Sequence, residues 1–193
     1  IKNSKYGLLL NQQFQVDWNL LRRCNFTCTY CPPDIHDLVS GFPSMEQYRK
    51  EFNELKIPTN KTAHFILNGG EPTLHPNILE VVQMCHKVGT VEVLSNGTAP
   101  IKMYDTLLDY AKVNISLHHE LINEKHMQKF IDIALLDKGI LLFKYFNTFD
   151  EEKFGKYLNV LKKLNNVGVI SNIRLSSRIM PGDSPEKEKS WLT

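Results

Sequence analysis

Hydrophobic and polar residues alternate along this chain in short blocks whose period changes repeatedly. In residues 14–21, polar Asp17 and Asn19 alternate with larger apolar residues, which is the pattern of a strand with one buried face. In residues 77–87 the apolar residues recur at helical spacing, which is the pattern of an amphipathic helix. The two patterns take turns along most of the chain, so strands and helices are expected to alternate.

This alternation predicts an α/β fold. The expected strands are 14–21, 63–68, 91–94, 113–117, 140–146 and 167–175. The expected helices lie between them at 44–55, 77–87, 102–110, 127–135 and 151–164. Helices between successive strands indicate parallel βαβ crossovers, and eight such units would close a full barrel. Six strands therefore predict a (β/α)6 partial TIM barrel with parallel strands that is open on one side.

The predicted barrel forms a single domain over residues 14–176. A chain of 193 residues is long enough for one substantial core and too short for two independent domains to be expected. Residues 1–13 are expected to be an N-terminal extension. Residues 177–193 are polar and marked by prolines, so they are expected to be a C-terminal linker or the start of a further extension.

Composition narrows the class of protein. The net charge is +2 and the basic residues are not grouped, so a nucleic-acid partner is not indicated. No apolar run approaches the roughly 18 residues that a membrane span needs, so no membrane partner is expected. The expected location is the cytoplasm.

Three of the four cysteines, Cys24, Cys28 and Cys31, lie close together directly after the first predicted strand. Clustered thiolates can converge on a metal centre, and three of them leave one coordination position open in a zinc site or an iron-sulfur cluster. A disulfide with one spare thiol is a second interpretation, and a Cys3His zinc-binding structural module that includes His36 is a third. The spacing alone leaves all three open. Cys85, on a predicted helix, is expected to be a core residue.

The neighbours of these cysteines resemble the cluster loop of the radical S-adenosylmethionine (SAM) superfamily. The pattern of that loop is C-x3-C-x-aromatic-C, and Tyr30 occupies the aromatic position before Cys31. A second stretch, residues 68–76, reads Asn-Gly-Gly-Glu-Pro-Thr-Leu-His-Pro and is similar to the GGE motif that follows the second strand in the superfamily. Two motifs in the right order are far more specific than either motif alone.

The resemblance implies both a fold and a chemistry. Radical SAM enzymes are built on a (β/α)6 partial barrel, in which three thiolates hold a 4Fe-4S cluster and SAM chelates the fourth iron. The implied activity is reductive cleavage of SAM to a 5'-deoxyadenosyl radical that abstracts hydrogen from a substrate. That substrate is unidentified and is either a peptide or protein or a small metabolite. A low-potential electron donor such as flavodoxin or ferredoxin is the implied partner.

The motifs also imply roles for individual residues. Cys24, Cys28 and Cys31 match the metal ligands. Tyr30 matches the position that meets adenine, and the two glycines match positions where the backbone approaches the methionine amino group of SAM. The implied contacts to the cofactor SAM are Tyr30, Gly69, Gly70, Glu71, Ser95, Asn96 and Ser116.

Two adjacent histidines follow the fourth predicted strand. Neighbouring strand residues point to opposite faces, so at most one of them enters the barrel, and we expect His118 to line the SAM or substrate pocket. Ligands of parallel α/β folds gather at the carboxyl ends of the strands, so His119, Lys144 and Arg174 are the expected substrate contacts. The ordinary alternatives are a buried, hydrogen-bonded histidine and surface salt bridges.

Overall fold

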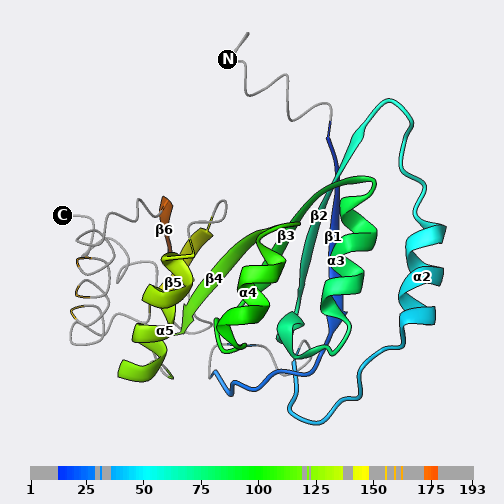
Figure 1. Ribbon diagram of the computed structural model, residues 1–193. Helices are drawn as coiled ribbons and strands as arrows, with labels where there is room; N and C mark the ends of the chain where they lie inside the picture. Colours follow the sequence, from blue (N-terminus) through cyan, green and yellow to red (C-terminus); the bar gives the residue numbers. More distant parts are fainter. Residues whose placement is uncertain are drawn as a thin grey trace, which may run out of the picture.

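The computed structural model describes residues 13–28, 31, 36–118, 121, 123–136, 141–147, 155, 159, 162 and 172–177. Within these residues, six strands form one sheet in the order β1-β2-β3-β4-β5-β6 (Figure 1). The strands are β1 (Gln13–Leu21), β2 (Thr62–Gly69), β3 (Gly89–Ser95), β4 (Lys112–His118), β5 (Leu141–Asn147) and β6 (Asn172–Ser177). Each strand pairs in parallel with the next. This is the arrangement of a partial barrel, so the predicted fold class is confirmed.

Helices connect the strands as the sequence predicts. They are α2 (Met45–Glu54), α3 (Ile78–His86), α4 (Ile101–Leu107) and α5 (Glu124–Ala134), and a short 3-10 helix, η1 (Pro72–Leu74), follows β2. The helix predicted over 151–164 lies outside the described residues, except that residues 155, 159 and 162 are helical. The last strand runs to Ser177, two residues beyond its predicted end at 175, and residues 167–171 lie outside the described part.

Two predicted details of the helices are corrected. Helix α4 was expected to reach 110 but ends at Leu107, because the amides of Asp109 and Tyr110 turn back to carbonyls three residues earlier in the chain. The sequence of Ser44 and Gln47 also has the form of a capping box. The Ser44 hydroxyl accepts the Gln47 backbone amide at 3.2 Å, which is the first half of the box, and the hydrogen bond found for the Gln47 side chain runs from its nitrogen to Glu51 at 3.0 Å instead of to the Ser44 backbone.

The core lies between the helices and one face of the sheet. Helix α3 packs against β3, α4 packs against β4, and α4 packs against both α3 and α5. Cys85 of α3 is fully buried in this layer, and desolvation raises the pKa of its thiol to about 12, as expected for a core cysteine. The strand residues buried here alternate along the chain: Ala63, Phe65, Leu67, Val91, Val93, Val113 and Ile115.

The first strand keeps its alternation until the point where the chain leaves for the cysteines. The Trp18 ring stacks on Phe52 of α2, whereas Asp17 and Asn19 are exposed. The alternation ends at Leu20 and Leu21, which are both buried, and the pairing of β1 with β2 shifts register there. Such an irregularity re-aims the strand, and the cysteine loop begins directly after it.

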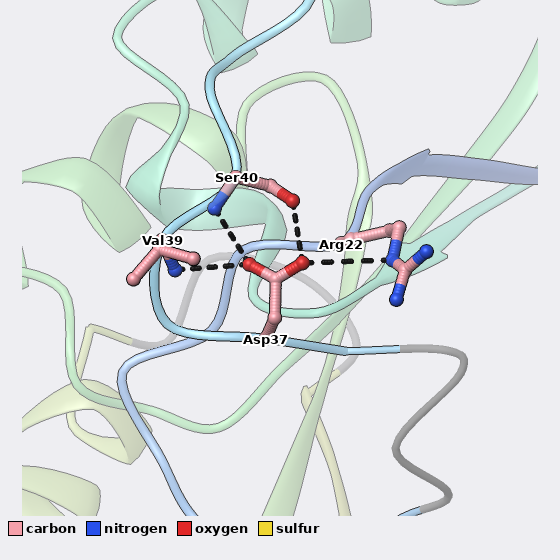
Figure 2. A network of polar contacts seen from close by, with 4 residues as sticks. All are labelled: Arg22, Asp37, Val39 and Ser40. Carbon is pink, nitrogen blue, oxygen red and sulfur yellow. Dashed lines mark hydrogen bonds and ion pairs between the residues drawn. The ribbon is translucent and has the colours of Figure 1, made fainter.

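The cysteine loop, residues 24–36, is closed at its base by Asp37. The Cys24 amide donates to the Asp37 carbonyl at 2.7 Å, and the Asp37 amide donates to the Arg22 carbonyl at 2.9 Å. Figure 2 shows the Asp37 carboxylate, which accepts hydrogen bonds from the hydroxyl and amide of Ser40 and from the amide of Val39. The Arg22 guanidinium forms an ion pair with the same carboxylate at 3.6 Å. One aspartate therefore joins the start of the loop to its end.

No helix in the part of the chain that the structure describes has the length and apolar character needed to span a membrane.

The base of the loop makes stability depend on acid. Hydrogen bonds from the Ser40 side chain and amide are the main cause that lowers the pKa of Asp37 from 3.8 to about 2, and the Val39 amide and Arg22 add to them. Because the folded value lies below the unfolded one, the stabilisation is complete above about pH 4 and is lost as pH falls toward about 2. Asp37→Asn should therefore have a lower unfolding free energy than wild type, and the difference between the two should be largest above about pH 4. Urea denaturation of cluster-free protein measures this, and a difference independent of pH would contradict it.

Candidate functional site

The three cysteines of the loop share one small cluster with the apolar side chains of Phe26 and Leu121. All three are thiols rather than members of a disulfide. The Phe26 amide donates to the Cys24 sulfur at 3.4 Å, and the Cys31 amide donates to the Cys28 carbonyl at 3.1 Å. The backbone of the loop thus gathers the thiols into a common, partly buried environment.

The electrostatics of this cluster suit a cationic centre. Burial is the largest cause that raises the pKa of the Cys24 thiol, and the negative charges of Glu71 and Cys31 raise it further. Thiolates that repel one another need a positive charge between them, and a metal centre bound by soft sulfur ligands supplies it. The donor set therefore fits a thiolate-bound metal cluster.

The thiols are gathered without forming a finished metal site. Within the described residues, no three Cys, His, Asp or Glu side chains form a group that could hold a metal ion as they stand. This applies to the Cys3His set with His36 as much as to the three cysteines alone. A single metal ion would thus require these side chains to move closer together, a condition that does not apply to a 4Fe-4S cluster, in which each thiolate binds a different iron.

The two glycines after β2 bring the ends of β1 and β2 together. The Gly70 amide donates to the Leu21 carbonyl at 2.7 Å, and the Glu71 amide donates to the Arg23 carbonyl at 2.9 Å. Gly69 has a φ of 130°, which side-chain-bearing residues rarely adopt. A Cβ on Gly70 would meet the carbonyl oxygens of Arg22 and Arg23. In this structure, the absence of side chains on Gly69 and Gly70 lets the backbone of residues 21–23 lie directly against them.

Glu71 is a buried carboxylate that lies between the ends of β2 and β3. Its side chain accepts hydrogen bonds from the Thr73 amide at 3.0 Å, the Thr73 hydroxyl, the Ser95 hydroxyl at 2.8 Å and the Asn96 amide at 2.6 Å. It is 1% exposed, and desolvation is the main cause that raises its pKa, while these hydrogen bonds oppose that rise. Glu71 therefore ties the end of β2 to the end of β3.

Asn96 connects the end of β3 to the cysteine loop. Its side-chain amide donates to the Asn25 side chain at 2.8 Å and lies 4.0 Å from the Cys24 sulfur. The side-chain oxygen of Asn96, Oδ1, accepts hydrogen bonds from the backbone amide and the hydroxyl of Thr98. The Thr98 hydroxyl also accepts a hydrogen bond from the side-chain nitrogen of Asn25 at 2.9 Å. Lys129 of α5 donates to the Thr98 carbonyl at 2.8 Å. A polar network thus runs from the loop across β3 to α5.

His118, at the end of β4, reaches the loop from the other side. Its Nδ1 lies 3.2 Å from the Cys28 sulfur. Its ring meets the Phe26 ring edge to face, with centroids 5.4 Å apart. The sequence predicted that His118 would face the SAM or substrate pocket, and the structure places it against the cysteine loop.

The remaining predicted site residues are placed by the backbone alone or lie outside the described part. Ser116 of β4 pairs with Lys144 of β5, and Lys144 pairs with Arg174 of β6, so the three occupy neighbouring register positions. Tyr30 and His119 lie outside the described residues.

Four residues of this region had no role in the predictions: Asn25, Asp37, Thr73 and Thr98. Thr73 stands inside the GGE stretch and Asn25 stands beside a cysteine, so their positions in the motifs were usable signals. Asp37 gave no such signal, because the backbone groups through which it closes the loop belong to Arg22 and Cys24, at the other end of the loop.

A separate hollow of about 520 Å³ lies at the base of the loop. Its lining residues are Asn19, Leu20, Leu21, Arg22, Ser40, Gly41 and Pro43. None of the cysteines lines it, so it is distinct from the thiol cluster.

Gly70→Ala should disrupt the junction between β1 and β2. The added Cβ would overlap backbone oxygens that cannot move independently, so we expect a loss of about 1–3 kcal/mol or more in unfolding free energy. Gly41→Ala is the matched control, because a Cβ there meets nothing within 4 Å. Denaturant unfolding of both variants measures the effect, and equal stabilities would contradict it.

Glu71→Gln should destabilise the same region. The amide would turn one acceptor oxygen into a donor that faces donors from Thr73, Ser95 or Asn96, at a cost of about 1–3 kcal/mol. The exposed Glu54→Gln is the control and should stay within about 0.5 kcal/mol of wild type. Thermal and urea unfolding test this, and a Glu71→Gln protein as stable as the control would refute it.

Comparison with known proteins bears on the identity of the site. Residues 18–189 match the family model of the Radical SAM superfamily. GTP 3',8-cyclase of Acaryochloris marina is 41% identical over 69 residues, which are 34% of this chain and 20% of that protein. GTP 3',8-cyclase of Microcystis aeruginosa is 38% identical over 115 residues, which are 53% of this chain and 35% of that protein.

A further relative and one solved structure are also similar to this chain. The subtilosin biosynthesis protein AlbA of Bacillus subtilis is 34% identical over 82 residues, which are 42% of this chain and 18% of that protein. This chain thus spans well under half the length of the curated relatives that it matches. A structure of anSMEcpe with bound AdoMet has the same fold, with a TM-score of 0.59 and 18% identity over 88% of this chain and 52% of that chain.

The family match covers most of the sequence, including both motifs, the end of β1 and all of the five later strands. Enzymes of this superfamily use a 4Fe-4S cluster together with SAM. The chain belongs to the radical SAM superfamily.

Proposed function

We propose that this chain is the core of an enzyme that cleaves SAM reductively and uses the resulting radical on a further substrate. The observation that supports this best is the gathering of three thiols in one loop, beside the buried ends of β2 and β3. Three thiolates leave one iron of a 4Fe-4S cluster without a protein ligand, and that iron is the position for SAM. The predicted unit, residues 14–176, would carry this core, with 1–13 and 177–193 as extensions.

Cys24, Cys28 and Cys31 would hold the cluster. Bound there, a cluster would supply one electron for reductive cleavage of the C5'–S bond of SAM, which yields methionine and a 5'-deoxyadenosyl radical able to take a hydrogen atom from the substrate. The residues of the chain bind and orient the reactants and exclude water. This role agrees with the apolar Phe26 and Leu121 that surround the thiols.

The proposed SAM contacts lie around the strand ends. We propose that Gly69 and Gly70 offer backbone groups and Ser116 a hydroxyl group to SAM, and that Tyr30 meets the adenine. Glu71, Ser95 and Asn96 form hydrogen bonds to other protein groups, so we propose that these three act mainly by holding the backbone in place. Their effect on SAM would then be indirect.

The substrate is proposed to be either a peptide or protein or a small metabolite, since relatives of both kinds match the chain. His119, Lys144 and Arg174 are the proposed substrate contacts, and the neighbouring register of the last two agrees with a shared role. The electron is proposed to come from a flavodoxin or ferredoxin. We also propose a cytoplasmic location, where thiols stay reduced.

The first experiment measures 5'-deoxyadenosine released from SAM by protein purified without oxygen, reconstituted with iron and sulfide, and supplied with dithionite. Wild type should hold iron and release product, whereas Cys28→Ala should lose both. Cys85→Ala is the matched control and should retain both, because Cys85 is buried in the α3 layer away from the loop.

A colourless protein that contains zinc, and that loses it in His36→Ala, would contradict the proposal. That result would support the Cys3His zinc module, since zinc is d10 and colourless whereas an iron-sulfur cluster is brown.

A further inference from the structure

Cys28 is contacted by a residue of a distant strand. Cys28 is buried, and its sulfur lies 3.2 Å from the Nδ1 of His118. The two residues are 90 positions apart in the sequence. By comparison, the Cys24 sulfur receives the Phe26 amide at 3.4 Å and faces the Asn96 amide at 4.0 Å, which are longer contacts. The contact between His118 and Cys28 is therefore the shortest of the three.

The His118 ring is held in place by its surroundings. Phe26, which stands between Cys24 and Cys28 in the loop, meets the ring edge to face with an interplanar angle of 82°. The His118 carbonyl accepts the Leu121 amide at 3.0 Å, and Leu121 packs in the same cluster as the thiols. Backbone pairing with Phe146 of β5 fixes the strand end itself. A ring constrained in this way can aim its Nδ1 at one sulfur.

We propose that His118 is a positioning residue for the cluster, whose Nδ1–H donates a hydrogen bond to the Cys28 thiolate. This inference rests on the proposed function, because the thiolate is the form of Cys28 that binds iron. A hydrogen-bond donor to a ligand sulfur stabilises negative charge on that sulfur. Reduction adds one electron, so the cluster together with its thiolate ligands carries more negative charge in the reduced state. His118 therefore raises the reduction potential of the cluster and holds the Cys28 sulfur in its binding position.

This role differs from a contact to SAM or substrate, and the difference can be measured. His118→Phe keeps an aromatic ring against Phe26 but removes the donor. His118→Asn keeps an amide donor at a position close to that of Nδ1. His126→Phe is the matched control, since the His126 ring also packs against Phe26, with centroids 6.0 Å apart, from helix α5.

The experiment compares reconstituted wild type and these three variants by iron and sulfide content, by the EPR spectrum of the reduced cluster and by its midpoint potential in a redox titration. The affinity for SAM is measured in parallel. We expect His118→Phe to have a more negative midpoint potential and an altered EPR spectrum, His118→Asn to recover most of both, and His126→Phe to match wild type. SAM affinity should change by less than about threefold in all of them.

Several results would overturn the proposal. Equal potentials in all four proteins would do so, and so would a large loss of SAM affinity in His118→Phe at unchanged potential, which would make His118 a SAM contact. If His118→Phe fails to retain a cluster, retention by His118→Asn supports the donor role, and loss from both refutes it. A wild-type protein that holds no iron-sulfur cluster would instead refute the proposed function together with this inference.

Discussion

The site depends on a buried carboxylate that is fully surrounded by donors. Burying a carboxylate in an apolar core is strongly unfavourable unless hydrogen bonds replace the water that it loses. Glu71 meets this condition with donors from Thr73 in its own turn and from Ser95 and Asn96 at the end of β3. Since these donors belong to two strands, the carboxylate can be buried only when both strand ends are in place.

The cysteine loop relies on this junction because it has little regular structure of its own. Its base is closed by Asp37, its Asn25 is joined to Asn96, and its Cys28 meets His118. These three contacts come from the loop's own return, from β3 and from β4. Thiols on an irregular loop are thereby positioned by strands that belong to the rigid part of the fold, which is the arrangement that a metal centre with an open coordination position requires.

Much of the fold could be predicted because its signals are local. The period of apolar residues changes from two to about 3.6 at each strand-to-helix junction, and this predicted the order of elements from β1 to α5. The errors fall at element ends, where local and tertiary preferences compete. Helix α4 stops early because its last amides form tighter turns, and the side chain of Gln47 pairs with Glu51 along the exposed face of α2 while its backbone amide pairs with Ser44.

The sequence by itself determined the chemistry of this protein: three thiols in one short loop, a glycine-rich turn and the alternation that builds a parallel sheet are all readable from neighbouring residues. Only the tertiary structure decided which groups meet those thiols, because His118 and Asn96 are brought to the loop by strand pairing over long sequence separations. It also decided that Gly70 lies against the backbone of Arg22 and Arg23, and that Glu71 points into the protein. Spacing specifies which side chains are available, whereas packing of distant segments specifies which of them come within hydrogen-bonding distance.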